Sequence, residues 1–123
     1  MDRNIGISGM EDLLEHLPKE KQNWFCFGHI LKFECKELFD YENWGNYYNA
    51  ELILSDDSEV YKIRLLLKHI SGQISICIAR DITGLTIRNM ENRDPEPGHR
   101  FRVYDFEEDT ISIYCEAIEV SLL

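Results

Sequence analysis

Apolar and polar residues alternate with a period of two over most of the chain, a pattern that is typical of half-buried β-strands. The alternation predicts strands over residues 25–35, 48–55, 61–67, 74–78, 101–104 and 111–122. Along the last of these the apolar phase slips by one residue, which predicts a β-bulge near Glu116 or Ala117. Short strands joined by turns rather than by helices favour an antiparallel arrangement.

Glycine and polar residues mark the predicted breaks between these strands. Residues 56–58 and 71–72 are typical turn sequences. The aromatic and polar stretch 38–49 is expected to be a loop that leads into the strand 48–55, and residues 89–98 are expected to be an exposed loop. Gly84 precedes an apolar pair, Leu85 and Ile87, where a bulge or a second short strand fits equally well.

A period near 3.6 precedes the strands and predicts a short amphipathic helix that ends at Pro18. Ser8 and Glu11 have the spacing of a capping box at its start. The apolar stripe consists of Met10, Leu13, Leu14 and Leu17. The sequence also permits a second helical turn over residues 19–23. We therefore expect an α+β, mostly β chain: an antiparallel sheet or sandwich of six to seven strands with one or two short N-terminal helices.

The length of 123 residues matches one domain, with a helical segment at about 8–23 and a β-rich body at about 24–123. The composition, 44% hydrophobic and 29% charged, is that of a chain that folds around a hydrophobic core without disulfide or metal cross-links. The four cysteines have no CxxC spacing, so we expect reduced thiols, with Cys35, Cys77 and Cys115 buried in strands. No secretory leader or membrane span is indicated, and a cytoplasmic location is expected.

The net charge of −10 is distributed unevenly along the chain. Residues 1–59 carry 13 acids and 5 bases, residues 60–104 carry 4 acids and 8 bases, and residues 105–123 carry 6 acids and no base. Such a field repels phosphate backbones and anionic lipid, so nucleic acid and membrane are poor partners. It attracts basic proteins and accelerates their association.

No pattern of catalytic or metal-ligating residues stands out, so we expect no enzyme activity, no cofactor and no metal site. The four histidines have neither HxH nor HxxxH spacing. Asp105, Glu107, Asp109 and Glu116 imitate the ligand spacing of an EF-hand, but Thr110 occupies the position where that loop requires glycine. An enzyme remains the weaker alternative.

Two blocks resemble the small bacterial immunity proteins that are encoded beside polymorphic or contact-dependent toxins. The first is W-x-x-Y-Y-N-A-E at residues 44–51, and the second is GHRFRVYDFEEDTISIYCEAIEV at residues 98–120. In such families an aromatic residue, a small polar residue and an Ala-Glu pair open a strand. Their chain closes with a V-x-D-x-E run and a terminal strand that carries a lone cysteine.

The resemblance implies a non-enzymatic inhibitor that binds one cognate toxin domain and covers its active site. Many such toxins are nucleases with a basic groove, and an acidic surface can occupy such a groove in place of phosphates. The candidate charged contacts are Asp105, Glu107, Glu108, Asp109 and Glu116, together with Asp56, Asp57 and Glu59. The candidate apolar anchors are Trp44, Tyr47, Tyr48 and Tyr104.

Other interpretations of the same residues stay open at this point. The acids can be solvated turn carboxylates, and Trp44 and Tyr47 can belong to the core. The alternative function is a small-ligand or carbohydrate-binding β-sandwich module, in which Trp44 and Tyr47 form a stacking platform in a pocket.

Overall fold

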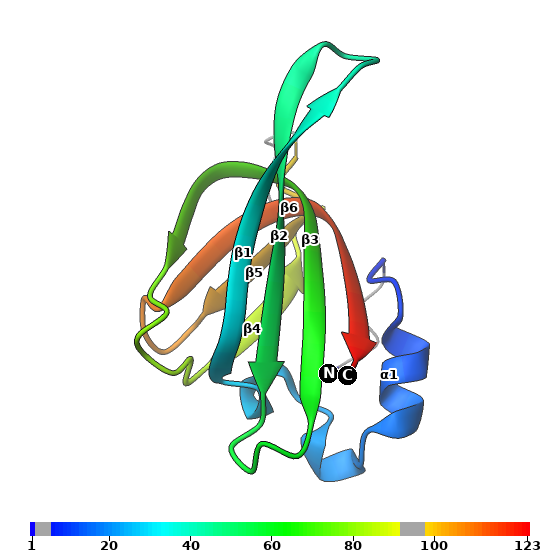
Figure 1. Cartoon of the computed structure of the whole chain (residues 1–123). Helices are drawn as coiled ribbons and strands as arrows, with labels where there is room; N and C mark the ends of the chain where they lie inside the picture. Colours follow the sequence, from blue (N-terminus) through cyan, green and yellow to red (C-terminus); the bar gives the residue numbers. More distant parts are fainter. Residues whose placement is uncertain (2–5, 92–97) are drawn as a thin grey trace.

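Six strands form a single antiparallel sheet in the computed structural model of the chain, which describes residues 1, 6–91 and 98–123 (Figure 1). The strands are β1 (His29–Asp40), β2 (Gly45–Ser55), β3 (Lys62–Ile76), β4 (Leu85–Asn89), β5 (Phe101–Asp105) and β6 (Ile111–Leu122). They are preceded by one helix, α1 (Met10–His16), and by two 3-10 turns, η1 (Lys19–Lys21) and η2 (Trp24–Cys26). The predicted fold class, mostly β and antiparallel with short N-terminal helices, is confirmed.

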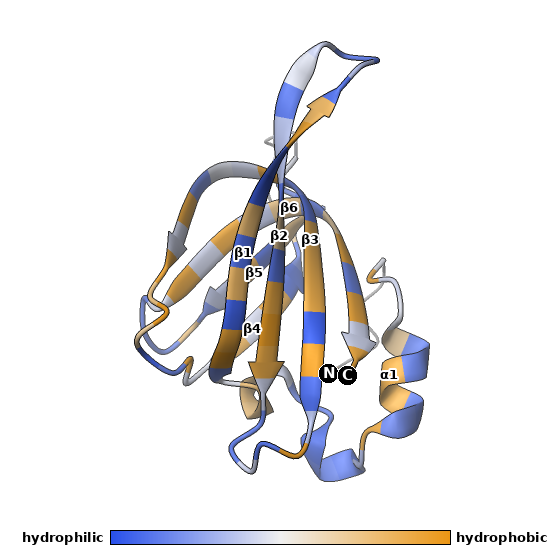
Figure 2. Ribbon diagram, viewed as in Figure 1, coloured by the Kyte–Doolittle hydropathy of each residue, from blue (hydrophilic) through white to orange (hydrophobic). Residues whose placement is uncertain are grey.

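The strands lie in the order β1-β2-β3-β6-β5-β4, with β3 and β6 at the centre. Figure 1 shows β4 and β5 behind the β1–β2–β3 half, so the sheet curls until its two halves enclose a core. The bands of apolar residues in Figure 2 follow the strands around this core. The largest fully buried side chains are Phe27, Phe101, Leu13, Leu52, Leu54, Ile63, Leu65, Leu67, Leu85, Ile111, Ile113 and Ile118.

The two edges of the curled sheet meet at one end. The Ile82 amide, just before β4, donates a hydrogen bond of 2.7 Å to the Gly28 carbonyl, just before β1. The turn η2 packs against β4, and its Trp24 is buried. The outer edge of β1 has no strand partner among the described residues. Charged side chains on β1, such as Lys32 and Glu34, disfavour the pairing of this edge with a strand of another chain.

The N-terminal helix is confirmed, but the predicted capping box is wrong. Gly9, with φ of 90°, occupies the N-cap, and the structure gives this helix no side-chain cap. Ser8 instead extends the sheet, because its amide donates to the Ile118 carbonyl and its carbonyl accepts from the Val120 amide, at 3.0 and 2.8 Å. Of the predicted stripe, Met10, Leu13 and Leu17 are buried and Leu14 is half-buried.

The loop predicted over residues 38–49 is also wrong, because this stretch forms the far end of the long β1–β2 hairpin (Figure 1). The Asp40 carboxylate accepts the amides of Glu42 and Asn43 at 2.9 and 3.3 Å, and Trp44 adopts a left-handed conformation with φ of 49°. These contacts build a tight turn over residues 41–44. The hairpin projects into solvent on both faces, so it lacks the alternation of apolar residues from which strands are predicted.

The turn predicted at residues 71–72 does not end a strand, since β3 continues through it to Ile76. Gly72, with φ of 72°, lies within the shift in register between Ser71 and Ser75, so glycine allows a bend rather than a reversal. Gly84 precedes a separate strand, β4. Of the loop predicted at 89–98, residues 92–97 lie outside the described residues.

Two other strand predictions need correction. The strand expected from residue 25 begins at His29, because residues 24–26 form η2, and a bulge lies between Ile30 and Lys32. The apolar phase of β6 does slip after Cys115, but the pairing with β3 keeps its register there. His69 of β3, with φ of 52°, lies in the same part of the ladder. The alternation of apolar and polar residues therefore shifts on both strands at the same place, and no bulge is needed.

Replacement of Gly28 tests the closure of the sheet. A Cβ atom at Gly28 would lie 2.1 Å from the Ile82 carbonyl oxygen. We expect Gly28→Ala to lower the free energy of unfolding by about 2 kcal/mol or more, measured by urea denaturation. Gly45→Ala is the matched control, because its nearest atom would be the Asn43 carbonyl oxygen at 4.0 Å. Equal stability of the two variants would contradict the closure.

Candidate functional site

Two acidic turns and a loop that carries one acid and one base meet at the end of the sheet that lies away from the β1–β2 hairpin tip (Figure 1). They are the turn 56–59 between β2 and β3, the loop 77–84 between β3 and β4, and the turn 106–110 between β5 and β6. His29 joins the first two, since its ring nitrogens lie 3.9 Å from the Glu59 carboxylate and 3.0 Å from the Asp81 carboxylate. Arg80 joins the second to the third through an ion pair with Glu108.

The carboxylate of Asp105 is buried and ties two of these segments together. It accepts the amides of Thr83 and Gly84 at 3.2 and 3.0 Å, the amides of Glu107 and Glu108 at 2.9 and 3.2 Å, and the Thr110 hydroxyl at 2.6 Å. Burial, the largest single effect, raises the pKa of Asp105, but the donated hydrogen bonds outweigh it and hold the pKa below its usual value. Its oxygens therefore accept hydrogen bonds from within the protein rather than from a partner.

Asp56 has the same role in the turn 56–59 and is fully buried. Its oxygens accept the Ser58 hydroxyl at 2.5 Å and the Tyr61 amide at 3.1 Å, and Lys21 pairs with it at 3.0 Å. Burial raises the pKa of Asp56, but these partners together lower it to about 2. Asp56 and Asp105 are therefore neither surface contacts nor solvated carboxylates, and we do not retain them as candidates.

The carboxylates left at the surface form what we call the acidic end. It consists of Asp57, Glu59, Asp81, Glu107, Glu108 and Asp109, all exposed. Lys21, which pairs with Asp57 at 3.2 Å, and Arg80 offset part of this charge. Asp81 carries no signal in the sequence, because its neighbours form no run of charged residues.

A groove of about 430 Å³ opens at the acidic end. Lys21, Asp57 and Asp81 contribute charged groups to its lining, and Phe25 contributes an aromatic ring that is 56% exposed. Phe25 was predicted to lie on the apolar face of a strand. It lies on η2 instead and offers an apolar contact in a groove that Asp57 and Asp81 also line.

The exposed aromatic residues of the hairpin lie at the opposite end of the sheet. Phe39 contacts Tyr41 and Trp44 edge to face, with ring centroids 4.8 and 6.1 Å apart, and we call these three residues the aromatic tip. Tyr41 and Trp44 are 78% and 79% exposed, so Trp44 does not belong to the core. Tyr48 pairs with Glu37 across the hairpin and is also exposed.

Tyr47 does not share a binding platform with Trp44. It stacks on His69 at a centroid distance of 4.2 Å and pairs with Leu38, whereas the ring that Trp44 contacts belongs to the next residue, Phe39. Successive residues of a strand point to opposite faces, so Tyr47 and Phe39 lie on different sides of the hairpin. The stacking platform of the alternative prediction is therefore not formed.

The two remaining candidates lie elsewhere on the sheet. Glu116 is exposed on β6, five residues beyond its first residue and so roughly 17 Å from the turn 106–110. Tyr104 lies on β5, where the Arg102 guanidinium covers its ring at 4.2 Å. The structure thus divides the predicted contact residues among separate surfaces.

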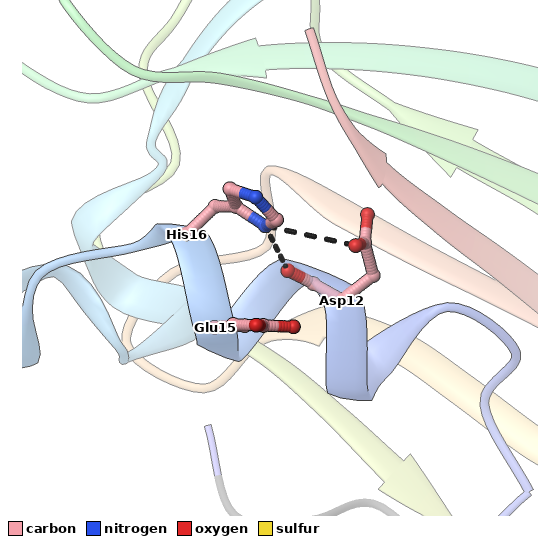
Figure 3. A group of neighbouring side chains, drawn as sticks. All are labelled: Asp12, Glu15 and His16. Atoms are coloured by element: carbon pink, nitrogen blue, oxygen red, sulfur yellow. Dashed lines mark hydrogen bonds and ion pairs between the residues drawn. The ribbon is translucent and has the colours of Figure 1, made fainter.

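One group of possible metal ligands occurs among the described residues, on α1: Asp12, Glu15 and His16 (Figure 3). All three are exposed, and the His16 ring nitrogen Nδ1 lies 2.8 Å from the Asp12 carbonyl oxygen of its own helix. That contact raises the pKa of His16 and, with the Asp12 carboxylate, accounts for the arrangement. Nothing else at this position indicates an ion.

All four cysteines are free thiols. Cys115 is buried as predicted, and burial raises its pKa to about 12, so it is unreactive. The prediction of burial is wrong for Cys35, which is exposed on β1, and only partly right for Cys77, which is half-buried.

No family model matches the chain, and no curated protein or solved structure is similar enough to it to count as a match. None of the helices in the described part of the chain has the length and apolar character needed to cross a membrane.

Neutralising Asp105 should destabilise the acidic end. In Asp105→Asn the amide group faces backbone donors, so we expect the free energy of unfolding at neutral pH to fall by about 2–4 kcal/mol. The lowered pKa values of Asp56 and Asp105 also mean that the stabilisation they provide is present above the ordinary pKa of an aspartate, ~4, and is lost as the pH falls below it, for Asp56 towards about 2. Asp105→Asn should therefore flatten the loss of stability over this range.

Chemical denaturation at several pH values measures both effects. Asp109→Asn, four residues along the same turn and exposed, is the control and should keep the stability and the acid dependence of the unaltered protein. If Asp105→Asn behaves like this control, the carboxylate does not hold the turns.

Proposed function

We propose that this protein is an immunity-type inhibitor, which binds a cognate toxin domain with its acidic end and covers a basic, nuclease-like groove. The observation that carries the proposal is that two acidic turns, 56–59 and 106–110, which are distant in sequence, converge with Asp81 on one end of the sheet. The resemblance of residues 44–51 and 98–120 to bacterial immunity proteins supports the same class.

The acidic end is suited to such a contact because its charges are fixed in place. Asp105 and Asp56 hold their turns from inside, so the exposed carboxylates beside them are presented by ordered backbone. Glu107 and Asp109 form no ion pair among the described residues, and they would remain available to lysine or arginine on a partner. Preorganised charges of this kind raise the association rate, and this effect becomes smaller as the salt concentration rises.

Affinity in such complexes comes from buried anchors rather than from charges at the rim. Phe25 is the anchor at the acidic end, because its exposed ring lies in the groove that Asp57 and Asp81 line. β1 runs from His29 at this end to Asp40 below the aromatic tip, roughly 37 Å at 3.4 Å per residue. A standard interface, ~800 Å² per partner and thus ~32 Å across, does not reach both ends.

Co-expression tests the proposal directly. We would clone the reading frame immediately upstream, express its C-terminal region alone and with this protein, and measure cell survival and co-purification. We expect the fragment to kill alone and this chain to restore growth while it co-purifies. A harmless fragment, or killing that this chain does not prevent, would contradict the proposal of a cognate neighbour.

Charge reversal locates the contact surface. Glu107→Lys with Asp109→Lys should reduce the association rate by about tenfold or more at low salt, measured by surface plasmon resonance. The control, Glu11→Lys with Glu15→Lys, makes the same change of net charge on exposed positions of α1 and should leave most of the rate intact. Equal losses in both variants would show that only net charge matters.

Two exposed aromatic residues distinguish the ends of the molecule. Phe25→Ala should weaken the complex by about tenfold or more through faster dissociation, whereas Trp44→Ala should change the affinity less than threefold. Trp44 is the more exposed of the two, so general surface hydrophobicity predicts the opposite order. If Trp44→Ala is the more damaging, the toxin binds the aromatic tip.

A further inference from the structure

The outer face of β4, β5 and β6 carries positive charge in an otherwise acidic protein. Arg88 of β4 pairs directly with Arg102 of β5, and Arg102 pairs with Tyr114 of β6. The adjacent row of the same face contains Thr86, Tyr104 and Ser112. These residues alternate with the buried Ile87, Val103 and Ile113 of the core. We call the six outer residues the arginine face.

Arg88 and Arg102 lack the acidic partners that the other arginines described by the structure have. Among the described residues, Arg64 pairs with Glu51, Arg80 with Glu108 and Arg100 with Glu91. No carboxylate in the described part of the chain pairs with Arg88 or Arg102. Like charges directly opposite each other on antiparallel strands are destabilising. An anion between the two guanidinium groups would relieve this repulsion.

The Arg102 side chain is held in position by aromatic rings, but one of its hydrogen-bond donors has no partner among the described residues. Its guanidinium carbon lies 4.2 Å from the centroid of the Tyr104 ring and 5.6 Å from that of Tyr114. Its Nε is buried and has no hydrogen-bond partner among the described residues, and its Nη2 reaches only the Ser112 hydroxyl, at 3.5 Å. Buried donors are normally paired, so this unpaired donor needs an explanation.

A hollow of about 400 Å³ adjoins the arginine face and shares Ser112 and Tyr114 with it. Gly72, Gln73 and Ser75 line the hollow from the bend of β3, and His99, which stacks on Tyr114 at 4.2 Å, lines it from the other side. Its hydroxyl and amide groups are suitable donors for oxygen atoms. Its size fits the organic part of a small molecule beside the arginines.

We propose that the arginine face binds a phosphate or phosphate-monoester ligand, with Arg88 and Arg102 on the oxyanion and the hollow of residues 72–75, 99, 112 and 114 on the rest of the molecule. Planar guanidinium groups match the oxygens of phosphate and donate two hydrogen bonds at once. The net charge of −10 does not prevent this, because exposed charges beyond about 8 Å are largely screened at physiological salt. The proposal is independent of the proposed function.

Inorganic phosphate and phenyl phosphate are the probes. With each replacing chloride at constant ionic strength, we expect the unfolding temperature to rise by about 5 °C at tenfold over the dissociation constant. Isothermal titration calorimetry then gives the affinities. Tighter binding of phenyl phosphate supports an organic ligand that fills the hollow, and equal binding supports recognition of the oxyanion alone.

Arg88→Gln is the decisive variant, because Arg88 is exposed and its replacement leaves the core unchanged. We expect it to bind both probes about tenfold more weakly. Arg64→Gln is the matched control and should bind as the unaltered protein does, since Arg64 is paired with Glu51 elsewhere on the sheet. An unaltered protein that responds no more to phosphate than to chloride, or Arg88→Gln with unchanged affinity, would overturn the proposal.

Discussion

The pairing of β3 with β6 is the interaction on which the rest of the structure depends. Both strands are long, and each belongs to the front half of the curled sheet at one end and to the back half at the other. Their phase changes together near His69, and the bend at Gly72 turns β3 along the curve. Because the pairing holds through both irregularities, β1–β2 and β4–β5 are attached to one continuous support and enclose one core.

Carboxylates have two separate uses in this acidic chain. Asp56 and Asp105 are buried and satisfy backbone amides, so they stabilise the turns even though they carry charge. Their neighbours Asp57 and Glu107 project into solvent and supply the field that a basic partner would meet. The same turns therefore combine an internal anchor with an external contact. On the outer face of β4 and β5, by contrast, Arg88 and Arg102 make the local charge positive.

The elements that could be predicted from the sequence are those with one buried and one exposed face. Strands with one buried face, such as β5 and β6, were predicted by their alternation, whereas the hairpin end at 38–49 was missed because both of its faces meet solvent. The burial of Asp56 and Asp105 was also missed, since it depends in part on partners distant in sequence, Lys21 for Asp56 and Thr83 for Asp105. The immunity class itself stays a prediction.

The contact of Ser8 with Ile118 and Val120 joins segments that are about 110 residues apart in synthesis. α1 and β3 both depend on residues 111–122 for their packing, so neither can reach its final state while β6 is still inside the ribosome. Until then the apolar faces of α1, β2 and β3 are uncovered, and only local pairings such as β1–β2 and β2–β3 can form. The topology therefore completes the core only after β6 has been synthesised, and until then the nascent chain exposes apolar surface that favours aggregation.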